Sequence, residues 1–262
     1  MRSTCATEIK YRDIFKLTRK TIKGNLRFLV GEQANSLKRQ VTLFHYVRAA
    51  YLVEAIYALC KQGLATEAMV LLRSLLNLFI NIKWLTKEDC EKRFERYADF
   101  EVIYKKLSID TLFEHGEIWD EIEKPEINIH DEDFEKIKNK YELKNRRDYF
   151  NWSGKTIYQM AKDVTLEKEY AIIYGRLSSR EHTSPDSVRD YLETSEKGFT
   201  EIKQVKKAKD IDLVLLTALQ YYYQIKAILH DIFSIEWRDM KSYEKEFSDL
   251  QNKYWGNSKE KV

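Results

Sequence analysis

Residues that interrupt helices are scarce along the whole chain. Eight glycines and two prolines occur in 262 residues, fewer than the average usage of globular proteins. Long stretches rich in Lys, Glu, Leu and Ile instead repeat their apolar residues with helical spacing. Strands would have few turn residues to join them. Because 44% of the residues are hydrophobic, enough to build a core, we expect an all-α fold, a single helical bundle domain over residues 1–262.

Periodicity and capping residues locate the expected helices. Ser153 is a plausible cap for one helix, and Ser184-Pro185-Asp186 is typical of a helix start, so the helix before it should end near His182. The apolar stripe of the second helix is expected to comprise Leu37, Val41, Phe44, Val47, Tyr51 and Ile56. The predicted helices cover about residues 7–29, 32–61, 65–85, 87–107, 152–164, 166–182, 200–233 and 240–254.

Helical periodicity weakens in one long segment. Between residues 108 and 149 the chain carries Gly116, Pro125 and many acidic residues. Glycine, proline and clustered polar residues favour loops over helices. We therefore expect an irregular acidic insertion that covers one end of the bundle, and a flexible tail from about residue 255 to residue 262.

Two segments, 64–85 and 211–235, are apolar enough to suggest membrane spans. Charged residues interrupt both, among them Arg73 in the first and Asp231 in the second. Charges near a bilayer centre are costly, so we expect buried helices of a protein with no membrane contact. Three widely spaced cysteines and an N-terminus without signal-peptide features favour a cytoplasmic location.

Charge is distributed unevenly along the chain. Residues 1–48 hold eleven Lys/Arg against three Asp/Glu, whereas residues 114–136 hold ten Asp/Glu against two Lys. The two segments could be solvated faces, or could attract one another within or between chains, as in a homodimer. Alternatively, the basic residues 1–48 bind nucleic acid or another polyanion.

A polar stripe crosses the otherwise apolar segment "AMVLLRSLLNLFINIKWL". Arg73, Asn77 and Asn81 are spaced four residues apart, so they share one face of a helix, spread over about 80°. A buried guanidinium must find acceptors because it cannot lose its proton. Arg73 is therefore expected to have fixed partners.

A second polar stripe, Tyr174, Ser178 and His182, has the same spacing, with Glu181 beside it. If the two stripes face each other, they form either a hydrogen-bonded network that fixes helix register or a pocket. In a pocket, Arg73 would hold an anion and His182, favoured as a cation by the helix C-terminus, would act as acid or base. The third possibility is that the stripes never meet.

Familiar cofactor and metal motifs are missing. The sequence has no phosphate-binding glycine loop, no Cys/His metal spacing and no nucleophile elbow. We interpret the acidic stretch 130–135 as solvated, and we predict no cofactor and no metal.

Three stretches together resemble an uncharacterised bacterial family catalogued as a domain of unknown function. They are "GLATEAMVLLRSLLNLFINIKWL", "WSGKTI" and "YGRLSSREH". The resemblance covers about residues 28–233 and implies an all-helical fold with no established activity. The family usually has Glu at the position of Asn77.

Arg176 and His182 are separated by five residues, which resembles the motif of helical ribonucleases of the higher eukaryote and prokaryote nucleotide-binding (HEPN) superfamily. Two functional hypotheses follow. In the first, the chain binds a small anionic ligand or a partner protein between the helices of Arg73 and His182, with Asn77, Asn81, Arg176 and Glu181 as further ligand contacts. In the alternative, it is a metal-independent ribonuclease of bacterial phage defence or abortive infection.

Overall fold

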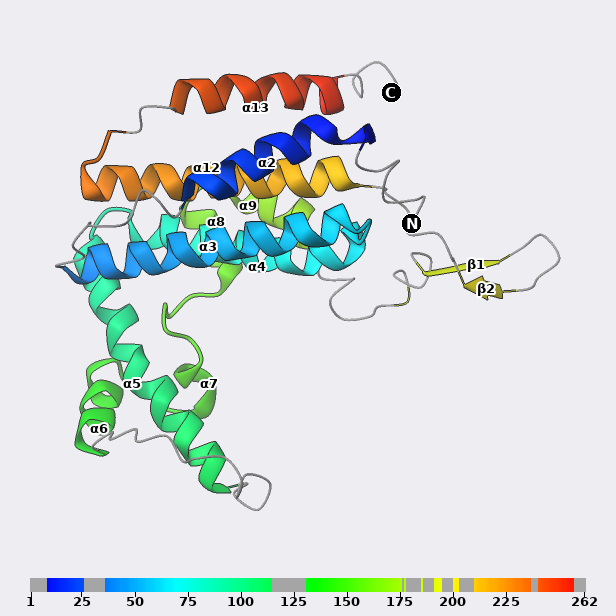
Figure 1. Ribbon diagram of the computed structural model, residues 1–262. Helices are drawn as coiled ribbons and strands as arrows, with labels where there is room; N and C mark the ends of the chain where they lie inside the picture. Colours follow the sequence, from blue (N-terminus) through cyan, green and yellow to red (C-terminus); the bar gives the residue numbers. More distant parts are fainter. Residues whose placement is uncertain are drawn as a thin grey trace.

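The structure is a computed structural model that describes residues 9–25, 36–114, 131–175, 177, 185, 191–194, 200–202, 210–236 and 240–256. It is an all-α fold, as the sequence predicts (Figure 1). The helices of the bundle and its neighbours are α2 (Arg12–Asn25), α3 (Leu37–Lys61), α4 (Ala65–Leu85), α5 (Cys90–Glu114), α8 (Ile157–Asp163), α9 (Glu167–Glu169), α12 (Ile211–Phe233) and α13 (Met240–Trp255).

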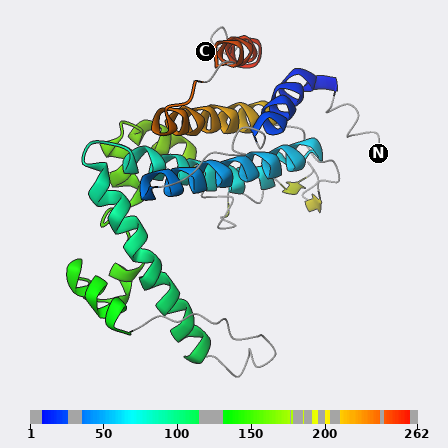
Figure 2. The same cartoon turned by 60° about the vertical axis from the view of Figure 1, so that its left-hand side comes forward.

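Helices α3, α4 and α12 pack side by side and form the centre of the bundle (Figures 1 and 2). Side chains of α4 and α12 are apolar on most of their circumference, which is typical of helices with neighbours on several sides. Phe79 of α4 stacks on Tyr221 of α12 with ring centres 5.3 Å apart. Tyr46 of α3 approaches Tyr222 at 5.6 Å. Aromatic contacts thus join α12 to both partner helices.

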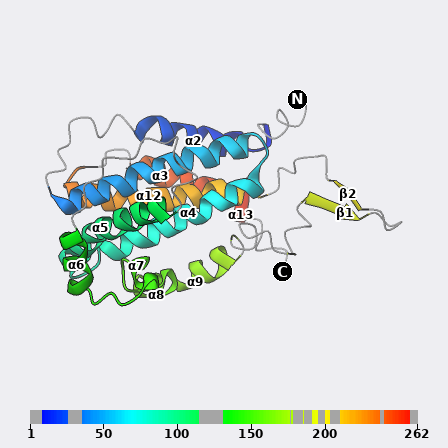
Figure 3. The ribbon, with the colours of Figure 1, turned by 90° about the horizontal axis from the view of Figure 1, so that it is seen from below.

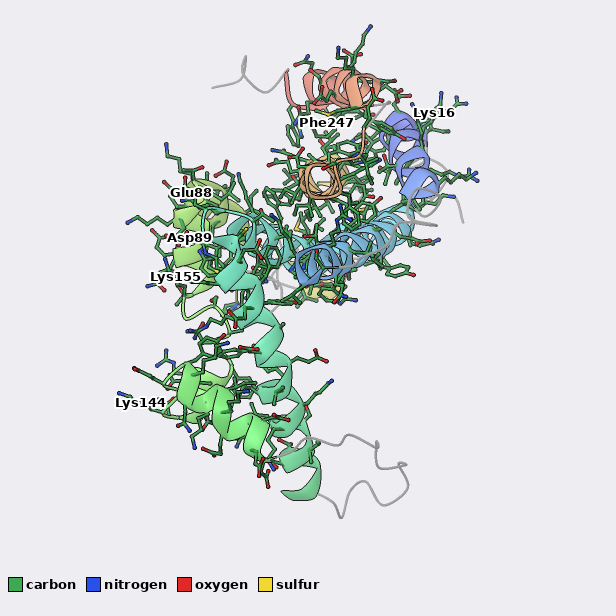
Figure 4. All side chains as sticks on the ribbon, turned by 90° about the vertical axis from the view of Figure 1, so that its left-hand side faces the viewer. Lys16, Glu88, Asp89, Lys144, Lys155 and Phe247 are labelled. Carbon is green, nitrogen blue, oxygen red and sulfur yellow. The ribbon has the colours of Figure 1, made fainter. Side chains whose placement is uncertain are left out.

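Helices α2 and α13 cover the bundle on the side of α12 (Figure 1). The apolar face of α2 is buried, including Ile14 and Leu17. An ion pair between Asp13 of α2 and Lys253 joins the two outer helices. Phe247 of α13 meets Tyr223 of α12 at 5.7 Å between ring centres (Figure 4).

The segment expected to be an irregular insertion is largely helical where it is described. Helix α5 continues to Glu114, and α6 (Asp131–Lys140) and α7 (Arg146–Tyr149) pack against it as an arm that points away from the bundle (Figures 1 and 2). The arm has its own apolar cluster of Phe100, Ile103, Ile137 and Leu143. A few well-placed apolar residues stabilise these short helices, so the described parts of the segment are helical and extend away from the bundle, whereas residues 115–130, the centre of the expected irregular insertion, lie outside the described residues.

Three further expectations need correction. On α3, Phe44 and Tyr51 are exposed, and the buried face includes His45, Ala49 and Val53 instead. The cap of α8 is Thr156, whose hydroxyl accepts from the Gln159 backbone in a capping box. The predicted helix over 200–233 begins at Ile211, since residues Thr200–Ile202 form strand β2, paired antiparallel with β1 (Leu192–Thr194).

Among the described residues, two helices, α3 and α4, are long and apolar enough to cross a membrane by length and composition. Within the bundle, 44% of the apolar window of α3 and 56% of that of α4 are buried. Core helices of soluble proteins have the same character, so the cytoplasmic location stays a prediction.

Candidate functional site

Arg73 places a guanidinium group inside the bundle. Its neighbours Leu72 and Leu76 on α4 are buried, and the Nε and Nη1 atoms of Arg73 are themselves buried. Because arginine stays protonated in proteins, a permanent positive charge lies among core residues. Such a charge needs acceptors or a compensating anion.

Tyr174 is one of the groups that hold Arg73. It ends the π-helical turn η2 (Tyr170–Tyr174), which follows α9 beneath α4 (Figure 3). The Nη2 atom of Arg73 donates a hydrogen bond to the Tyr174 hydroxyl. The guanidinium carbon lies 4.3 Å from the centre of the Tyr174 ring. The structure therefore brings together Arg73 and Tyr174, one residue from each predicted stripe.

The π-helical turn is a local feature that the sequence does not reveal. Such turns are rare and occur frequently at functional sites. In η2 the Tyr170 and Tyr174 rings stack at 4.3 Å between centres with an interplanar angle of 18°. Tyr174 is thus supported by the ring of Tyr170, one turn earlier in the chain. Tyr158 of α8 adds a third ring, whose centre lies 5.7 Å from that of Tyr170.

Tyr170 titrates outside the physiological range. Burial, with a further contribution from Tyr174, raises the pKa of Tyr170 to about 12, although the charge of Arg73 acts in the opposite direction. At neutral pH Tyr170 is therefore a protonated phenol that can donate a hydrogen bond. Tyr158 and Tyr170 were absent from the sequence-based site. Tyr170 could have been found, because it precedes Tyr174 by four residues, the spacing of the stripe itself.

The two amides of the α4 stripe carry buried acceptors without a donor in the described part of the chain. Oδ1 of Asn77 and Oδ1 of Asn81 are buried and have no hydrogen-bond partner among the described residues. Asn77 follows Arg73 by one helical turn, about 6 Å along the axis. A donor group of a ligand held by Arg73 could therefore reach Asn77.

Asn81 belongs to a different surface. It lines an aromatic groove of about 800 Å³ between α3 and α5, with Phe44, Tyr97, Tyr104 and Trp152, whereas Arg73 and Asn77 do not line it. The stripe turns by about 80° over two helical turns. That rotation carries Asn81 away from the face of Arg73. The polar stripe predicted on α4 therefore divides: Arg73 and Asn77 lie on one side of the helix, and Asn81 lies on the other.

Four predicted site residues lie outside the described residues. They are Arg176, Ser178, Glu181 and His182. Their role in ligand binding stays a prediction, as does the ribonuclease hypothesis that depends on Arg176 and His182.

The two described histidines lie in the core. His45 of α3 is 1% exposed, and its Nδ1 lies 2.8 Å from the Val41 carbonyl oxygen. Burial lowers its pKa to about 4. Burial also lowers the pKa of His230, whose Nδ1 lies 3.0 Å from the Ile235 carbonyl oxygen. Both are neutral at pH 7, and each hydrogen bond to a carbonyl identifies Nδ1 as the protonated nitrogen.

Within the described part of the chain, no cluster of three or more His, Cys, Asp or Glu side chains could hold a metal ion. The described residues of the Arg73 site offer a guanidinium, a hydroxyl and an amide group. Those groups suit recognition of a negatively charged group by hydrogen bonds.

The model of the Family of unknown function (DUF5677) matches residues 39–199 of the chain. The matched range includes Arg73 on α4 and Tyr174 in η2. Helix α2 lies before the matched range in the sequence. No curated protein and no solved structure matches the chain.

Proposed function

Since the chain belongs to the Family of unknown function (DUF5677), whose description assigns no activity, we propose a function from the site: the protein binds a small anionic ligand at Arg73. Tyr174 orients the guanidinium, and Asn77 accepts a hydrogen bond from a donor on the same ligand. The contact between Arg73 and Tyr174 is the observation that carries the proposal.

The chemistry of the guanidinium defines the ligand class. Arginine offers five N–H donors in a planar fork that matches carboxylates and phosphates. The hydrogen bond to Tyr174 uses one of these donors. The ring contact fixes the plane of the fork, which reduces the conformational entropy lost when a ligand binds.

The buried amide adds a second requirement. Oδ1 of Asn77 lacks a donor among the described residues, and an unsatisfied buried acceptor costs about 1–3 kcal/mol. A ligand that carries a hydroxyl or amino group beside its anionic group would satisfy it. Hydroxy acids, amino acids and sugar phosphates share this chemistry, whereas inorganic sulfate does not.

A thermal-shift panel tests the proposal. The panel contains inorganic phosphate, sulfate, simple dicarboxylates, hydroxy acids, amino acids and sugar phosphates. A ligand at 100 times its Kd stabilises the folded protein by about 2.7 kcal/mol, which corresponds to an increase in Tm of about 5–10 °C for a chain of this length. We expect such an increase with at least one anion that carries a donor group.

Arg73→Lys is the informative variant, because lysine keeps the charge but loses the planar fork. Arg96→Lys is its matched control. The Nε of Arg96 donates to the Trp152 carbonyl oxygen at 2.6 Å, and its guanidinium lies 4.5 Å from the Tyr141 ring centre. Loss of the ligand shift in Arg73→Lys but not in Arg96→Lys supports the proposal. Equal shifts in both variants, or no shift with any anion in the wild type, would contradict it.

A further inference from the structure

A basic groove lies on the outer helix α2 and the end of α3, and Arg73 does not line it. It has a volume of about 790 Å³ and is lined by Arg12, Lys16, Arg19, Lys20, Lys23 and Lys61, together with three apolar or aromatic residues. No carboxylate lines it. Figure 4 shows Lys16 pointing outward from α2, away from the bundle. The groove is thus a concentrated positive surface.

Acidic side chains neutralise only part of this surface. Asp13 on α2 pairs with Lys253, and Glu246 on α13 pairs with Lys20 at 2.5 Å. Four other groove cations, Arg12, Lys16, Arg19 and Lys23, are exposed and form no ion pair with any described residue. The described acidic start of α6 lies on the arm, on the opposite side of the bundle from α2 (Figure 1).

The cations form a linear array. From Arg12 to Lys23 the chain advances eleven residues, or about 16 Å along the helix axis. One strand of nucleic acid in a stacked geometry advances about 3.4 Å per phosphate, so the array spans about five nucleotides. A row of exposed charges with this reach matches a phosphodiester strand better than a compact anion.

Aromatic side chains complete the groove. Phe15 of α2 and Tyr57 of α3 both line it, and their rings meet edge-to-face at 5.7 Å between centres. Phe15 is buried, whereas Tyr57 is half-buried and presents part of its ring to the groove. Exposed aromatic rings beside a basic track stack on bases in proteins that bind single strands. The basic stretch of residues 1–48 does not include Tyr57, which lies later in α3. The sequence of that stretch alone therefore does not predict an aromatic ring in the groove.

The packing of α2 favours a nucleic acid over a membrane as the partner of the groove. An amphipathic helix binds a bilayer through its apolar face. The apolar face of α2 is already buried in the bundle, as Ile14 and Leu17 show. Only its cationic face, which lines the groove, is available for a partner.

We propose that the basic groove binds single-stranded nucleic acid through about five phosphates, with Tyr57 stacked on a base. The proposal is independent of ligand binding at Arg73. It also concerns a part of the chain that largely precedes the family match at residues 39–199.

Fluorescence anisotropy with labelled ten-nucleotide RNA and DNA strands tests the proposal on the full chain. Across a salt series, log K should fall with log salt with a slope of about −3.5, since each neutralised phosphate of a single strand contributes about −0.7. The double variant Lys16→Gln/Arg19→Gln should bind at least about tenfold more weakly and lower the magnitude of the slope by about 1.4. The RNA and DNA arms show which strand the groove prefers.

A matched control keeps the test specific. Arg146→Gln/Arg147→Gln removes the same charge from exposed residues of α7 on the arm and should leave the affinity and the slope unchanged. Equal losses in both double variants would overturn the proposal, as would absence of oligonucleotide binding at 50 mM salt. It is also overturned if the groove variant abolishes only binding to anionic vesicles or salt-sensitive self-association. Circular dichroism establishes that each variant is folded.

Discussion

Arg73 in α4 and Tyr174 in the π-helical turn η2 contact each other across 101 residues of sequence, by a hydrogen bond and by a cation–π contact at 4.3 Å. The pair connects the core of the bundle to the segment that follows α9. The hydroxyl and the ring of Tyr174 also orient the guanidinium of Arg73. The pair therefore links the stability of the fold to the proposed binding of an anion.

Removing only the hydroxyl of this pair should destabilise the protein. In Tyr174→Phe the ring contact remains, but the hydrogen bond from the charged guanidinium is lost, so the free energy of unfolding should fall by about 2 kcal/mol. Urea unfolding followed by circular dichroism measures the change. Tyr158→Phe is the control, because that hydroxyl has no hydrogen bond among the described residues, and it should change stability by less than about 0.5 kcal/mol. Equal effects of the two variants would exclude the stabilising role of the Arg73–Tyr174 bond.

The buried neutral His45 predicts a loss of stability in mild acid. Its pKa is about 4 in the folded protein and 6.5 as its ordinary value. Between these values the unfolded state binds the proton and the folded state does not, so the free energy of unfolding falls as the pH decreases from about 6.5 to about 4. The contribution of His45 to this fall is about 3 kcal/mol.

His230 has a lowered pKa as well, so its protonation acts in the same direction. Unfolding free energies measured from pH 7 to pH 4 should therefore depend less steeply on pH in His45→Phe than in the wild type, and less steeply again in the double variant with His230→Phe. Parallel profiles for all three proteins would show that neither histidine is protonated preferentially in the unfolded state.

The arm should open without unfolding of the bundle. Its cluster is separate from the main core, and Ile103 is fully buried within it. Ile103→Ala leaves a cavity in this small cluster, and hydrogen exchange should accelerate in α6, α7 and the distal half of α5. Exchange in α4 and α12 should stay slow. The comparison is Ile80→Ala in the main core, which should accelerate exchange throughout; a global effect of Ile103→Ala would mean that the arm and bundle unfold as one unit.

The apolar helices α3 and α4 lead to a prediction about location. About half of the apolar window of each helix, 44% in α3 and 56% in α4, is buried within the bundle, where the two helices pack against each other and against α12. After cell lysis and ultracentrifugation, the protein should remain in the supernatant. Recovery in a membrane pellet that resists alkaline carbonate would contradict the cytoplasmic location expected from the sequence.

Long uninterrupted helices were predictable where a repeating pattern is strong. The bounds of α4 match the expected range 65–85, and α13 differs from the expected range by one residue. Shorter helices depend on tertiary contacts, so periodicity misses them. Ile137 and Leu143 are too few to produce a pattern, yet both contact the extended α5 helix in the arm cluster.

The candidate site was predictable only in part. The spacing of Arg73 and Tyr174 identified two residues that the structure brings together. The π-helical turn was not predictable, because the residues Tyr170–Tyr174 carry no signal that distinguishes a π-turn from an α-turn. The division of the α4 stripe also depended on tertiary structure, since only the position of α5 places Asn81 in the aromatic groove.

Native mass spectrometry tests most directly whether Arg73 holds a small anion. The wild-type protein is titrated with the anion that gives the largest thermal shift, and bound ligands per chain are counted. We predict one bound anion per chain in the wild type and in Arg96→Lys, and loss of that anion in folded Arg73→Lys. One bound anion in all three proteins would contradict this prediction.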